Sequence, residues 1–161
     1  MSLPGDLFVV RTHGWAARAI QVFTNSWANH AGIVTDNSGA TVEAQPQGAE
    51  MGNLSTYAGD RILVGSPVEL TSQQRAAIST AALRLQGTPY SWLDIVSLAL
   101  LQLHIRPGFI RRRVARQDRL ICSQLVDLCY LQAGVHLFSD GRDPSDVTPG
   151  DLANLLTKGT S

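Results

Sequence analysis

Residues 29–44 read NHAGIVTDNSGATVEA, two apolar runs on either side of a polar segment. The polar segment, Asp36-Asn37-Ser38-Gly39, has the composition of a turn, because Asp and Asn bond nearby backbone groups and Gly accepts positive φ. The runs at 30–35 and 41–44 have the length and the β-branched content of strands. We therefore predict a β-hairpin centred near the 36–37 bond.

The remaining apolar patterns predict more strands early in the chain and helices later. Strands are expected at 7–10 and 61–64, and the spacing of apolar residues at 15–23 is helical. Later helices are expected from Thr71 to about 85, from near Tyr90 to just before Arg106, from near Cys122 to Gly134, and at 151–156. Strands followed by helices favour an α+β fold with an antiparallel sheet packed against helices. With no repeat or linker, residues 1–161 are expected to form a single domain.

Composition is that of a globular protein, with 44% hydrophobic and 16% charged residues and no net charge. Charge is unevenly spread, since the 106–119 segment holds six arginines and one acid, Asp118. The segment is either a solvated face or a surface for an anionic partner, such as a lipid headgroup or a cell-wall polymer. Nucleic acid is disfavoured, because Phe109 is the segment's sole stacking aromatic.

The N-terminal residues predict no secretory signal peptide, because they lack a basic region and carry Pro4, Gly5 and Asp6 in place of an apolar core. The longest apolar stretch, 92–105, is shorter than the roughly 20 residues that cross a bilayer. We therefore expect no transmembrane segment and synthesis in the cytoplasm, with delivery to the cell envelope by another route left open.

The two cysteines, Cys122 and Cys129, are seven residues apart in one predicted helix. Their Cα atoms should lie about 10 Å apart along the axis, beyond the roughly 7 Å that a disulfide allows. Both are thus expected to be free thiols. Cys122 falls in the first turn of that helix, where unpaired N–H groups and the helix dipole favour a thiolate. Cys129 lies on the apolar stripe and is expected in the core, a role that position alone also leaves open for Cys122.

A catalytic thiolate needs a base, and His30 is the best candidate among the four histidines. No pair of histidines has metal-ligand spacing and there is no Cys-x-x-Cys, so we expect neither a metal nor a cofactor. Glu43 is a charged residue in an apolar strand, and about the predicted turn it lies opposite His30. Its carboxylate could orient the His30 ring, or it could be an exposed cross-strand glutamate.

Four segments together resemble the NlpC/P60 superfamily of papain-like thiol enzymes. They are NHAGIV from Asn29, VEAQPQG from Val42, GTPY from Gly87, and CSQLV from Cys122. In the usual members the cysteine precedes the histidine, whereas here the histidine comes first. This order resembles the circularly permuted branch, which includes YiiX-like proteins and lecithin:retinol acyltransferase-like enzymes.

The resemblance implies a papain-like fold and a thiol hydrolase that acts on cell-wall peptides as an amidase or endopeptidase. It places Cys122 as the nucleophile, His30 as the base, Glu43 as the third polar residue and Tyr90 as a substrate-binding residue near the nucleophile. The sequence departs from the superfamily's pattern at two places that bear on the identity of the substrate. The usual Trp-Gly-Gly is here Trp92-Leu93-Asp94, and the stretch between Tyr90 and Cys122 is long and rich in arginine.

Two other functions stay open at this point. The same three residues could carry lipid acyl transfer or ester hydrolysis at a membrane surface, because the apolar 92–105 stretch is followed by arginines. Alternatively, the chain could be a non-enzymatic binding module of a phage or cell-wall assembly on a papain-like scaffold.

Overall fold

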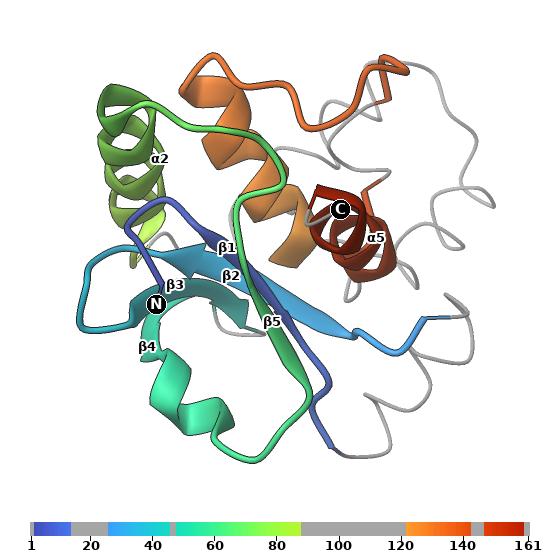
Figure 1. Ribbon diagram of the computed structural model, residues 1–161. Helices are drawn as coiled ribbons and strands as arrows, with labels where there is room; N and C mark the ends of the chain where they lie inside the picture. The colour runs from blue at the N-terminus through green and yellow to red at the C-terminus, as the bar shows by residue number, and fades with distance from the viewer. Residues whose placement is uncertain (1, 14–25, 46–47, 88–121, 143–146, 160–161) are drawn as a thin grey trace, which may run out of the picture.

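A five-stranded antiparallel sheet is the centre of the computed structural model, which describes residues 2–13, 26–45, 48–87, 122–142 and 147–159. The strands lie in the order β4-β3-β2-β1-β5 (Figure 1). Their bounds are Leu7–Val10 (β1), His30–Val34 (β2), Ala40–Gln45 (β3), Gly48–Asn53 (β4) and Ile62–Gly65 (β5). The predicted α+β class, with an antiparallel sheet packed against helices, is confirmed.

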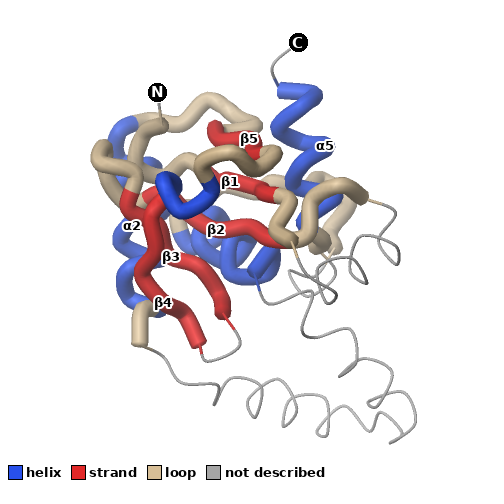
Figure 2. Tube along the Cα trace, turned by 90° about the horizontal axis from the view of Figure 1, so that it is seen from below, coloured by secondary structure: helices blue, strands red, loops and turns tan. Residues whose placement is uncertain are grey.

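In the part of the chain that the structure describes, three helices cover one face of the sheet (Figures 1 and 2). They are α2 (Ser72–Leu85), a helix at residues 122–132, and α5 (Pro149–Gly159). Their apolar side chains join those of the sheet in one core cluster, which includes Leu7, Ile33, Ile78, Leu125 and Leu152. None of the described helices has the length and apolar character needed to cross a membrane.

The opposite face of the sheet is covered by a short 3-10 helix, η1 (Leu54–Tyr57). A second, smaller cluster lies beneath it and consists of Phe8, Val10, Val34 and Tyr57. Both faces of the inner strand β1, which lies between β2 and β5, are thus covered, and all four of its residues are buried. This explains why its sequence, LFVV, is a continuous apolar run with no polar alternation.

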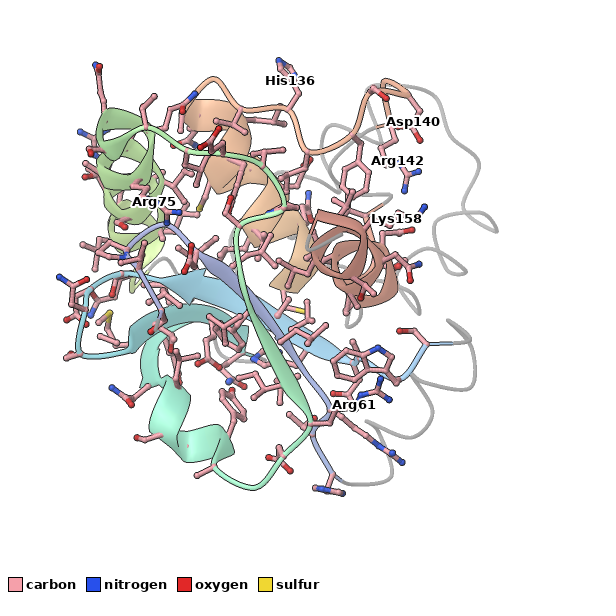
Figure 3. The ribbon with its side chains drawn as sticks, viewed as in Figure 1. Arg61, Arg75, His136, Asp140, Arg142 and Lys158 are labelled. Atoms are coloured by element: carbon pink, nitrogen blue, oxygen red, sulfur yellow. The ribbon has the colours of Figure 1, made fainter. Side chains whose placement is uncertain are left out.

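The helix at Ser72–Leu85 forms where the sequence predicts it, because Thr71 and Gln74 make a capping box at its N-terminus. Arg75, which is labelled in Figure 3, lies in the first turn of α2. It reaches the segment before β1 and pairs with Asp6 at 2.7 Å. The same guanidinium donates to the carbonyl of Pro4. The partly buried ion pair fixes α2 against the start of the sheet.

Three elements differ from the expectation. β4 and η1 were not predicted. The β4 sequence, GAEMGN, has no alternation of apolar and polar residues, and Ala49 is its one buried residue and its contribution to the core. The C-terminal helix begins at Pro149, two residues before the predicted 151, because proline is well tolerated in the first turn of a helix. The expected helices at 15–23 and from Tyr90 to before Arg106, and the arginine segment at 106–119, lie outside the described residues.

Candidate active site

His30 and Glu43 lie side by side on the face of the sheet that η1 covers. His30 is the first residue of β2, Glu43 lies in β3, and His30 Nε2 is 2.9 Å from Glu43 Oε2. The predicted register was wrong by two residues, because Glu43 pairs with Gly32 and not with His30. A shift of two keeps both side chains on one face, since the side-chain period of a strand is two. The two residues therefore meet as diagonal neighbours.

The Glu43 carboxylate is buried and held on both oxygens. Thr41 donates to Oε1 at 2.6 Å, and the hydroxyl of Tyr57 donates to Oε2, where Gln45 Nε2 also lies 3.4 Å away. Burial alone would raise the pKa of Glu43. The hydrogen bonds from His30, Thr41 and Tyr57 outweigh burial and lower the pKa below its usual range. Glu43 is therefore a fixed, ionised acceptor.

His30 also makes a side-chain hydrogen bond with Cys122, the residue at the described start of the 122–132 helix. Because Nε2 faces Glu43, Nδ1 is the ring nitrogen left for the thiol. Burial by itself lowers the pKa of His30. The hydrogen bonds and the negative charges of Cys122 and Glu43 together raise it to about 10. The site therefore favours an imidazolium that lies between the Cys122 sulfur and an ionised Glu43 carboxylate.

The two cysteines are both free thiols, as predicted, and they have different surroundings. Cys129 is fully buried in the main core cluster, and burial raises the pKa of its thiol to about 12. Cys122 retains 5% of its surface exposed and bonds to His30. Cys129 thus has the environment of an inert core residue, whereas Cys122 lies beside a basic side chain.

Two glycines make room for the site. A Cβ at Gly52 in β4 would lie 2.5 Å from Glu43 Oε1, so the missing side chain leaves space for the carboxylate. A Cβ at Gly32 would lie 2.6 Å from the ring of Phe8, which stands edge-on to His30. The same Cβ would lie 2.8 Å from the backbone oxygen of Val42, so Gly32 makes room for both the Phe8 ring and the backbone of β3. Both glycines serve close packing within strands.

Sequence reasoning missed the side chains that hold Glu43. Thr41 was detectable, because it is two residues from Glu43 in the same strand and so shares its face. Tyr57 gave no signal, since η1 was not predicted. Of the four candidate residues, the structure brings Cys122, His30 and Glu43 together, and Tyr90 lies outside the described residues.

Comparison with known proteins gives a structural relative. No protein-family model and no curated protein sequence matches the chain. In structure, the chain is similar to the crystal structure of the metalloprotein YiiX from Escherichia coli O157:H7 (DUF1105), with a TM-score of 0.55 and 20% sequence identity. The match covers 84% of this chain and 69% of that one. The chain therefore shares an overall fold with a YiiX protein.

That relative is described as a metalloprotein, so the question arises whether the side chains of the present site could bind a metal ion. Within the described ranges, no group of three or more His, Cys, Asp or Glu side chains is placed to hold a metal ion. His30 Nε2 and Glu43 Oε2 bond to each other, and Thr41 bonds to the second carboxylate oxygen. These atoms do not fit a metal site, and the chemistry below uses side chains alone.

Proposed function

We propose that the protein is a cysteine hydrolase that cleaves an amide or ester bond through a covalent acyl-enzyme. The observation that carries the proposal is the His30 imidazole between the Cys122 thiol and the buried Glu43 carboxylate. A nucleophile, a base bonded to it and a third group that orients the base are the recurring requirements of this chemistry. In this proposal Cys122 is the nucleophile, His30 the base and Glu43 the orienting group.

The acylation step follows from the contacts of His30. In the starting pair the proton of the Cys122 thiol is held on Nδ1 of the ring, and the Cys122 sulfur forms a bond to the substrate carbonyl carbon. The tetrahedral intermediate collapses as His30 returns that proton to the leaving amine or alcohol, and the carbon–nitrogen or carbon–oxygen bond breaks. A thioester on Cys122 and a neutral His30 remain.

Deacylation uses the same groups with water in place of the leaving group. His30 takes a proton from the water as its oxygen bonds to the thioester carbon, and the carbon–sulfur bond then breaks. The acid product leaves and the proton on His30 restores the starting pair with Cys122. Throughout, Nε2–H donates to Glu43, which holds the ring in place and stabilises each imidazolium. The backbone N–H of Cys122 is proposed to donate to the oxyanion.

The proposed substrate class is a cell-wall peptide, which makes the protein an amidase or endopeptidase. Two observations support this choice: the four segments that resemble the NlpC/P60 superfamily, and the fold shared with a YiiX protein. The order of His30, Glu43 and Cys122 along the chain further supports membership in the circularly permuted branch of that superfamily.

Hydrolysis of purified cell-wall peptides by matched cysteine variants tests the proposal. Cys122→Ala should reduce the hydrolysis rate to background, because the nucleophile is gone. Cys129→Ala, the matched control, removes a buried thiol outside the site and should retain activity once its stability is taken into account. Equal activity of Cys122→Ala and the wild type would refute the assignment of the nucleophile.

A further inference from the structure

Tyr57 lies at the end of η1 and points its hydroxyl at the candidate site. That hydroxyl donates to Glu43 Oε2, the oxygen that also accepts from His30 Nε2. Thr41 occupies the other oxygen. The carboxylate is therefore held between a strand residue on one side and η1 on the other, and it cannot rotate about its last bond without losing a hydrogen bond.

The ring of Tyr57 is fixed independently of its hydroxyl. Its centroid is 5.6 Å from that of Phe8 and 6.2 Å from that of His30. The ring belongs to the smaller core cluster, and its η1 backbone is capped by the Asn53 side chain. Phenylalanine would fill the same space. Since the hydroxyl's hydrogen-bond partner among the described residues is Glu43, the phenol oxygen has a role that packing does not require.

We propose that Tyr57 is a positioning residue of the active site, whose hydroxyl holds Glu43 ionised and aimed at His30. The inference rests on the proposed function, and it adds a fourth side chain that none of the sequence motifs contains. Donors that bond a carboxylate favour its charged form, and a charged Glu43 favours the imidazolium that accompanies a Cys122 thiolate. Tyr57 thus acts on the nucleophile through two intervening groups.

The charges around Tyr57 agree with a permanent donor. Burial, the hydrogen bond to Glu43 and the negative charges of Glu43, Cys122 and Asp60 all raise the pKa of Tyr57, so its hydroxyl stays protonated. His30 faces Glu43 from β2, and Glu50, the register partner of Glu43 in β4, is exposed. Glu43 and the His30–Cys122 pair are therefore the groups whose titration Tyr57 can change.

The pH profile of Cys122 alkylation tests this role without a known substrate. Rate constants for iodoacetamide are measured on the full chain by peptide mass spectrometry, which separates Cys122 from Cys129. In Tyr57→Phe, the acid limb of the Cys122 profile should move to higher pH by about one unit, because Glu43 loses a donor to its charged form. Tyr130→Phe is the matched control, since it removes a buried hydroxyl that donates to the Gly5 carbonyl and not to Glu43.

Each outcome decides the role of Tyr57. A shifted limb in Tyr57→Phe, with an unshifted limb in Tyr130→Phe, supports positioning. Coincident limbs in Tyr57→Phe and the wild type overturn it and leave the proposed hydrolase intact. If wild-type Cys122 reacts no faster than Cys129, the proposed hydrolase fails and the role of Tyr57 fails with it.

A second measurement covers the case in which Tyr57→Phe does not fold. Site-specific incorporation of 3-fluorotyrosine at position 57 keeps the Tyr57 ring and hydroxyl and makes the hydroxyl a stronger donor, while Tyr90 and Tyr130 stay unchanged. The acid limb of Cys122 alkylation should then move to lower pH. An unmoved limb would overturn the proposal.

Discussion

Gly52→Ala tests whether hydrogen bonds hold the Glu43 carboxylate in one position. The new Cβ would lie 2.5 Å from Glu43 Oε1 and 2.8 Å from Thr41 Oγ1. To restore an ordinary contact, the carboxylate must move by about 1 Å. A free glutamate could make that move at little cost, because Oε1 is the end of a flexible side chain. Here the move stretches hydrogen bonds to Thr41, Tyr57 and His30.

The loss in the free energy of unfolding that this displacement causes can be estimated, because the new Cβ overpacks the site. Overpacking of a well-packed site typically costs about 1–3 kcal/mol. For a chain of this size each kcal/mol lowers the melting temperature by about 2–4 °C, so a loss near the middle of the range gives about 4–8 °C. Alkylation of Cys122 at neutral pH should slow as well, because His30 loses part of its bond to Glu43.

Gly65→Ala is the matched control for this substitution. Gly65 also lies in an outer strand of the sheet, and among the described residues a Cβ there would meet only Leu156 Cδ2, at 3.8 Å. Both variants gain the same backbone preference for alanine over glycine, so their difference isolates the clash. Thermal unfolding followed by circular dichroism gives the comparison. If the two variants melt within about 1 °C of each other and alkylate equally, Glu43 moves freely and the reasoning is refuted.

Three further predictions concern the helix cap and the charge of His30. Thr71→Ala removes the capping box of α2 and should cost about 1 kcal/mol in urea unfolding; an unchanged midpoint would contradict the cap. The pKa of His30 is raised from 6.5 to about 10, so its charge contributes stability that is complete below pH 6.5 and lost as pH rises through about 10. The stability difference between wild type and His30→Gln should therefore shrink over that window, and a constant difference would argue against the raised pKa. Finally, an imidazolium beside Cys122 should raise the alkylation rate with anionic iodoacetate, relative to iodoacetamide, by about fivefold compared with free cysteine. If His30→Gln shows the same rate ratio as the wild type, the imidazolium is not its cause.

The predicted contact between the His30 and Glu43 side chains is correct even though the predicted strand register was wrong by two residues. The turn composition located the hairpin but not its centre, which lies between Asn37 and Ser38 and not one residue earlier. Moving the centre by one residue changes the pairing by two, and the side-chain period of a strand is also two. The two side chains therefore stayed on one face, whereas a pairing error of one would have separated them.

Other parts of the site depended on contacts that no local pattern encodes. β4 has two glycines and an exposed Met51, so it lacks the alternation of a half-buried strand. Its glycine at position 52 is explained only once the Glu43 carboxylate is seen beside it. Tyr57 reaches the site because η1 folds across the sheet, which is a consequence of tertiary packing. In contrast, the capping box at Thr71 is local in sequence and was therefore predictable.

Detection of an acyl group on Cys122 tests the proposed chemistry most directly. The full chain is incubated with cell-wall peptide fragments and, separately, with phospholipids, then quenched in acid and measured by intact mass and peptide mapping. We expect a mass increase equal to the acyl portion of one substrate, located on Cys122 and missing in Cys122→Ala. An adduct on Cys129, or turnover by the Cys122→Ala variant, would contradict the account.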